Sequence, residues 1–256
     1  MRQLHKSLVD LWWILKGQLY VLRIRWFWYV VLLSVSPLSF LFFLWFYGAN
    51  SSTTDTLYAI SGSIASSAVT AAMLSLGQTI GGMRETNVLE FYATLPVSKA
   101  AFLAALAGRG VLLAFPSALI VFFIGSLTLG SPVWDHIGML TVSYFAGAFS
   151  LAGVGTFIGF YSKTPETASL VTQVVQPLMV LFAPVYMPID RLPLVLQSVA
   201  KLIPTTYAAE AIRVAFGLGS RGIFYRDVAV LLAFGTFAFL LSTRRAAWRL
   251  GRSDAS

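Results

Sequence analysis

The sequence predicts an all-α polytopic membrane protein, a chain that crosses a lipid bilayer several times as helices. Of its 256 residues, 57% are hydrophobic and only 11% are charged, whereas soluble domains are nearer half apolar and a quarter charged. Windows 26–54 and 56–83 carry no charged side chain at all, and about 20 apolar residues are enough to cross the hydrocarbon core. We therefore expect a single transmembrane domain over 1–256 with six spans, an amphipathic interfacial helix before the first span and short re-entrant helices before the last.

The first 25 residues are expected to form the interfacial helix. One face of a helix over 1–25 would collect a stripe of apolar side chains, namely Leu4, Leu8, Leu11, Trp12, Leu15, Leu19 and Leu22. A helix with such a stripe and charges elsewhere lies in the plane of the lipid headgroups. The alternative is that this helix packs on the surface of a partner protein.

The six spans are expected at 26–47, 56–83, 102–127, 137–161, 168–186 and 223–243. The first has aromatic residues at both ends, as in the aromatic belts of membrane helices: Trp26, Trp28, Tyr29, Trp45 and Tyr47. The second and fourth each contain a G-x-x-x-G pair, Gly77 with Gly81 and Gly155 with Gly159. Small residues at this spacing predict close packing between helices.

The distribution of basic residues predicts that both termini are cytoplasmic. Short outer loops near 48–56 and 128–136 contain Asp55 and Asp135 but no Lys or Arg, which fits the positive-inside rule. The inner segments carry Arg2, Lys6, Lys16, Arg23, Arg25, Arg84, Lys99, Lys163, Arg244, Arg245, Arg249 and Arg252. The net charge of +8 therefore indicates contact with anionic inner-leaflet lipids rather than nucleic-acid binding.

Segment 187–222 is expected to form a pair of re-entrant helices on the outer side. Its two apolar pieces, 194–203 and 207–218, are separated by Pro204, and each is too short to cross. Such a pair is suited to a lid or lining over a pathway, and a simple extracellular helical hairpin is the alternative. The candidate residues in this outer segment are Pro188, Pro193, Pro204, Tyr207, Glu210 and Arg213.

Polar side chains within spans are costly and therefore informative. Gln78, Gln173 and Gln176 are candidates for lining a substrate path, with bonding to a neighbouring helix as the alternative. We expect Arg109 to extend toward the cytoplasmic interface, and Glu210 to pair locally with Arg213, three residues later.

Several function classes find no support in the sequence. There is no G-x-x-x-x-G-K-[ST] phosphate loop, no H-E-x-x-H or G-x-S-x-G signature and no cysteine, and the two histidines are far apart. We expect no catalytic residues, no metal site and no cofactor on this chain.

The loop between the second and third spans carries the best candidate for a docking element. Segment 84–95 combines apolar side chains with two acids, and a short amphipathic helix of this kind on the cytoplasmic side is suited to a groove on a partner. The candidate residues are Arg84, Glu85, Leu89, Glu90, Phe91 and Tyr92. A lipid-facing interfacial helix is the alternative.

Two stretches resemble the type-2 ABC exporter permeases, the membrane subunits driven by separate ATP-binding-cassette ATPases. The first stretch is Arg84-Glu85, then Leu89-Glu90, then Leu95-Pro96-Val97-Ser98-Lys99, although Asn87-Val88 stands where the family often has Gly-Thr. The second stretch begins with Pro188-Ile189 and Leu192-Pro193 and continues from Ile203-Pro204-Thr205-Thr206-Tyr207 through Glu210 to Arg213, with Ile203 in place of Asn.

The resemblance implies a permease dimer, of identical chains or with a close paralogue, that works with two ATPase subunits in the inner membrane. ATP and Mg²⁺ would bind to those subunits, 84–95 would be the coupling helix, and an amphipathic drug, lipid or peptide would be exported. The competing functions are an ATP-independent secondary transporter or channel, for which ion-coupling acids deep in the spans would be needed, and a membrane-embedded enzyme.

Overall fold

The computed structural model describes residues 2–23, 26–47, 52–129 and 136–245, and every regular element in these ranges is a helix. The helices are α1 (Arg2–Arg23), α2 (Trp26–Tyr47), α3 (Thr53–Ala68), the π-helix η1 (Val69–Leu74), α4 (Ser75–Glu85), α5 (Val88–Thr94), α6 (Lys99–Leu129), α7 (Ile137–Tyr161), α8 (Pro165–Leu181), the 3₁₀-helix η3 (Ile189–Arg191), α9 (Leu194–Ala200), α10 (Pro204–Ala215) and α11 (Arg221–Arg245). Arg25, Asp135, Arg249 and Arg252, which contributed to the charge argument, lie outside the described residues.

Five helical stretches among the described residues are long and apolar enough to cross a membrane: Trp26–Phe43, Thr54–Met83, Lys99–Leu127, Ile137–Tyr161 and Arg221–Arg244. Each coincides with a predicted span, so the all-α polytopic membrane fold is confirmed. The remaining predicted span, 168–186, corresponds to α8, which has 17 residues. That length is at the lower limit for crossing, so the sixth crossing stays a prediction.

The second span forms the centre of the bundle. α3, η1 and α4 follow one another without a break and contact α2, α6, α7, α8 and α10. Nearly every side chain from Ala59 to Met73 is buried. A helix surrounded on all sides needs small side chains if its neighbours are to approach closely, which explains why this span is rich in Ser, Ala and Gly.

The two G-x-x-x-G pairs bring helices of this one chain together. A Cβ added at Gly77 would lie 2.2 Å from the Thr172 Cγ2 atom on α8, and one at Gly155 would lie 2.3 Å from the Met73 carbonyl oxygen in η1. Both distances are far below van der Waals contact. The prediction of close helix packing at these positions is confirmed.

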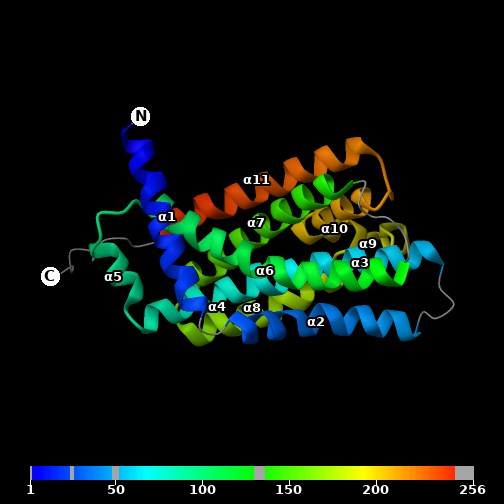
Figure 1. The fold of residues 1–256 in the computed structure, drawn as a ribbon, viewed down its shortest axis with the longest axis horizontal. Coiled ribbons are helices and arrows are strands. Elements are labelled where there is room, and N and C mark those ends of the chain that lie inside the picture. The colour runs from blue at the N-terminus through cyan, green and yellow to red at the C-terminus, as the bar shows by residue number, and fades with distance from the viewer. Residues whose placement is uncertain (1, 24–25, 48–51, 130–135, 246–256) are drawn as a thin grey trace.

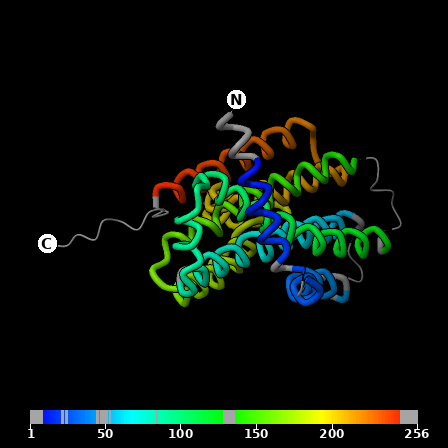
Figure 2. The backbone as a smooth tube through the Cα atoms, turned by 60° about the vertical axis from the view of Figure 1, so that its left-hand side comes forward, coloured from blue at the N-terminus to red at the C-terminus, as the bar shows by residue number. Residues whose placement is uncertain are grey.

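The shorter helices lie at the two ends of the bundle. α1 runs across the long helices at one end, where it packs on α6, and α5 projects beyond them at the same end (Figures 1 and 2). α9 and α10 lie at the opposite end (Figure 1). We refer to these as the α5 end and the α10 end.

Candidate functional site

The predicted docking segment 84–95 is divided by a turn. Arg84 and Glu85 form the end of α4, and α5 begins at Val88 after Asn87, whose φ of +55° lies in the left-handed region. Asn adopts this conformation more readily than most residues, so the Asn at this position favours a sharp change of direction here. As a result α5 leaves the axis of α4 and projects at the α5 end (Figure 1).

α5 has an inner and an outer face. On the inner face, Val88, Leu89 and Tyr92 pack against the hydrophobic core, and the Tyr92 ring lies 4.8 Å from that of Phe102 on α6. On the outer face, Glu90 is exposed and the Phe91 side chain is 61% exposed. Glu85, just before the turn, is also exposed. The helix therefore presents an acid and an aromatic ring outward while it is fixed to the bundle by its other side.

Hydrogen bonds connect α5 to α1 and α6. Gln18 of α1 donates from Nε2 to the Tyr92 hydroxyl at 3.1 Å, and Arg109 of α6 donates from Nη1 to the Gln18 Oε1 at 3.1 Å. The side chains of Gln18 and Arg109 are both buried. A single amide thus links α1 to α5 and α6, through partners that lie 74 and 91 residues further along the chain.

The linkage bears on two of the residues considered from the sequence. Arg109 is only 7% exposed and is covered by α1, which lies across α6, and its side chain extends to Gln18 of that helix. Tyr92 was expected on the docking surface with Glu90, but its hydroxyl points to Gln18 and its ring to Phe102. Gln18 was not predicted, because a Gln on an amphipathic helix has no special signal until the partner across the bundle is known.

At the α10 end, Arg213 holds α10 against the turn that follows α8. Its Nη2 donates to the carbonyl oxygens of Pro184 and Val185, and its guanidinium lies 4.2 Å from the centre of the Tyr58 ring. The residue is only 4% exposed. A buried guanidinium needs such partners, since desolvation of an unpaired charge costs several kcal/mol or more.

The expected pairing of Glu210 with Arg213 is wrong. Glu210 instead accepts from Arg226 of α11 at 2.9 Å, and Arg226 also binds Asp227 at 2.8 Å. Arg213 donates its hydrogen bonds to the turn after α8 instead. Asp227 is fully buried, with one carboxylate oxygen that makes no hydrogen bond. A charge within a predicted span was the signal that could have identified Asp227 from sequence.

The prolines of the outer segment mark the starts of helices. Pro188 and Pro193 directly precede η3 and α9, and Pro204 is the first residue of α10. Proline suits these positions because the first amide of a helix has no partner to lose. Tyr207 fixes the corner between α9 and α10 by donating from its hydroxyl to the Lys201 carbonyl oxygen at 2.6 Å.

The three candidate path-lining amides lie on α4 and α8. Gln78 and Gln173 are exposed, and Gln173 donates to Ser169 on its own helix at 2.8 Å. Gln176 is half-buried and lies 3.4 Å from Thr70 of η1. The structure thus turns two of these amides outward and one toward the central helix.

A family described as ABC-2 type transporter matches residues 10–216 of the chain. The matched range includes α5, the buried arginines Arg109 and Arg213, and the segment from η3 to α10. A search of the curated proteins gave no match.

The chain belongs to the ABC-2 type transporter family. It is the membrane subunit, or permease, of an ABC transporter and is a multi-pass membrane protein.

Proposed function

We propose that this permease carries out ATP-driven export. It would work as a dimer, of two identical chains or with a close paralogue, together with two ABC ATPase subunits that bind ATP and Mg²⁺. The α5 end would face the cytoplasm, with both termini on that side of the inner membrane. The observation that carries the proposal is the two-sided arrangement of α5, with Glu90 and Phe91 exposed and Tyr92 connected inward.

The outward residues of α5 would form the contact with the ATPase. An exposed aromatic ring beside an acid is suited to a partner groove with apolar walls and a basic rim. Tyr92, which turns inward, would transmit movement rather than bind the ATPase directly. Displacement of α5 would act on α1 through Gln18 and on α6 through Arg109 and Phe102.

At the opposite end, α9 and α10 would cap the translocation path. α10 is almost wholly buried, while Leu194, Val195 and Leu202 in and beside α9 are strongly exposed. Gln78 and Gln173, which are exposed on α4 and α8, would line a path between two permease chains. The largely apolar surroundings favour an amphipathic substrate such as a drug, a lipid or a peptide.

Charge reversal at the α5 end tests the proposal. The double variant Glu85→Lys/Glu90→Lys should lose co-purification of the ATPase and transport, because both acids lie on the exposed surface of this end. Asp190→Lys is the control, since Asp190 is an exposed acid in η3 near the α10 end. Undiminished complex and transport in the double variant would refute the assignment of α5.

One observation favours a second candidate, an ATP-independent secondary transporter. Asp227 is a fully buried carboxylate in α11 with one unpaired oxygen, and acids at such positions can couple transport to protons or other ions. Substrate flux in proteoliposomes that contain only this chain, abolished by Asp227→Asn, would support that function. Flux only with the ATPase and nucleotide would exclude it.

A further inference from the structure

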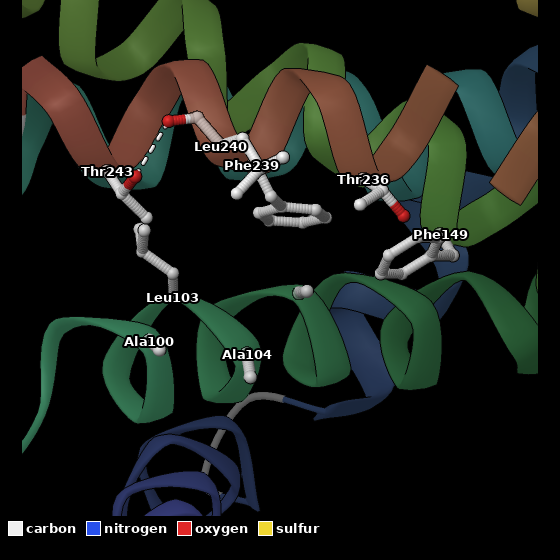
Figure 3. A pocket seen from close by; sticks show the side chains of 9 residues that line it. Ala100, Leu103, Ala104, Phe149, Thr236, Phe239, Leu240 and Thr243 are labelled. Carbon is white, nitrogen blue, oxygen red and sulfur yellow. Dashed lines mark hydrogen bonds between the residues drawn. The ribbon is translucent and has the colours of Figure 1, made fainter. Parts of the chain in front are cut away.

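A groove opens between the first part of α6 and the last part of α11, with α7 behind it (Figure 3). Its volume is about 250 Å³. It is lined by Ala100, Leu103, Ala104, Ala107, Phe149, Thr236, Phe239, Leu240 and Thr243. None of these residues takes part in the α1–α5–α6 linkage or in the polar contacts at the α10 end.

The groove exists because α6 presents short side chains to a helix that stands apart from it. Ala100, Ala104 and Ala107 are spaced by four and three residues, so they share one face of α6. α11 packs closely on α7 along its length but only lightly on α6. The Phe149 and Phe239 rings, 5.2 Å apart, support the space between the two helices.

The chemistry of the groove selects an apolar ligand. Thr236 and Thr243 are the only lining side chains with a hydroxyl, and the Thr243 hydroxyl already donates to the Leu240 carbonyl oxygen at 2.7 Å. Ligand sites lined predominantly by hydrophobic and aromatic side chains favour apolar ligand groups. The groove opens on the outside of the bundle, where Phe237 and Leu240 on the same stretch of α11 are strongly exposed.

Two basic residues that are the sequence neighbours of lining residues indicate where the polar end of the ligand would lie. Lys99 is the first residue of α6, next to Ala100, and Arg244 follows Thr243 near the end of α11. Both helices thus place a cation at the same end of the groove. Basic side chains at the membrane surface attract anionic headgroups, and long Lys and Arg side chains reach that level readily.

We infer that the α6–α11 groove binds one acyl chain of an anionic glycerophospholipid, with the phosphate of that lipid held at Lys99 and Arg244. The bound lipid fills the gap between two helices that otherwise contact each other little. The inference needs only that the bundle lies in a membrane, so it does not depend on the direction of transport or on the ATPase.

Native mass spectrometry of the purified chain with phosphatidylglycerol and phosphatidylcholine tests the site. The wild type should retain one phosphatidylglycerol in preference to phosphatidylcholine. Ala104→Phe should reduce this binding about tenfold, because its ring occupies the groove. Ala229→Phe is the matched control on an exposed position of α11 outside the groove, and it should bind as the wild type does.

The charge at the mouth is tested separately. Lys99→Gln and Arg244→Gln should each lower the preference for phosphatidylglycerol by about fivefold, which is the effect of one basic side chain near an anionic surface. Phosphatidylcholine binding should be unchanged. If the Lys99→Gln/Arg244→Gln double variant still preferred phosphatidylglycerol over phosphatidylcholine as the wild type does, the assignment of the headgroup site would be overturned.

Because the chain has no cysteine, the groove can also be blocked after folding. Ala104→Cys, labelled with a bulky maleimide in the assembled protein, should lose the bound lipid as Ala104→Phe does, which separates occlusion from misfolding. Retention of the lipid in the labelled protein would overturn the inference. Efficient disulfide cross-linking between two copies of Thr243→Cys would also overturn it, since the occupant would then be a second chain.

Discussion

Three arginines within or against the spanning helices have their charge compensated in different ways. Arg109 has one side-chain amide, Gln18, as its partner. Arg213 has two backbone carbonyls and an aromatic ring, and Arg226 has two carboxylates. Within the described part of the chain, Arg109 has the fewest partners of the three arginines. Loss of a partner should therefore lower the stability of the protein most at Arg109.

Gln18→Leu should destabilise the protein by about 1–3 kcal/mol, because it removes the partner of the buried Arg109 guanidinium and of the half-buried Tyr92 hydroxyl. The measurement is thermal unfolding of the purified protein in detergent. The double variant Gln18→Leu/Arg109→Leu should recover most of this loss, since replacement of both partners by apolar groups is close to neutral.

The control for this pair is Gln173→Leu. Gln173 is exposed and, among the contacts described, binds only Ser169 on its own helix. The stability of the protein should therefore change by no more than about 0.5 kcal/mol in this variant. If Gln18→Leu/Arg109→Leu were no more stable than Gln18→Leu alone, the Gln18 amide would not be the partner that stabilises Arg109.

At the scale of elements, the central helix shows how local geometry and packing depend on each other. η1 is a π-helical segment within a continuous span, and five of its six residues are buried. Such segments are uncommon and are often found at functional sites. Here η1 packs directly against Gly155 of α7 and lies beside Gln176 of α8.

Glycine substitutions should therefore have opposite effects at two helical positions. Gly155→Ala should destabilise the protein by about 1–3 kcal/mol, because the added methyl group would force α7 away from η1. Gly82→Ala, where nothing lies within 4 Å of the added Cβ, should stabilise it by about 0.5–1 kcal/mol through helix propensity. Unfolding of the two variants under one set of conditions provides the measurement, and equal effects would contradict the packing at Gly155.

At the scale of the whole molecule, the two ends of the bundle should face opposite sides of the membrane. α5 and α9 lie at different ends of the structure (Figure 1), and η3 shortly precedes α9 along the chain. The basic residues predict that the α5 end is cytoplasmic. The absence of cysteine allows this topology to be measured with single-cysteine variants.

Glu90→Cys should react with a membrane-impermeant maleimide only after the cytoplasmic side is opened, and Asp190→Cys should react in intact cells. Both native residues are exposed, so differences in labelling report the side of the membrane. Labelling of Glu90→Cys in intact cells would place α5 on the outer side of the membrane, where no ATP is present, and would refute the proposed contact between α5 and an ATPase.

Much of this architecture could be read from hydrophobicity alone. The predicted first and fourth spans coincide with α2 and α7, because a helix in lipid must satisfy its own backbone hydrogen bonds and be apolar over its whole length. The predicted interfacial segment coincides with α1, for which the signal was an apolar stripe on one face of the helix. Helix starts at Pro204 and the α5 turn at Asn87 follow from local backbone preferences that neighbours do not alter.

The pairing of side chains was decided only by the tertiary structure. Glu210 and Arg213 are neighbours on α10, yet each finds its partner on another element, and Tyr92 turns away from Glu90 to meet Gln18. Hydropathy and helical periodicity determine which segments cross and which face of each is apolar. They do not determine which helix covers that face, since the contacts between Arg109, Gln18 and Tyr92 join residues up to 91 positions apart.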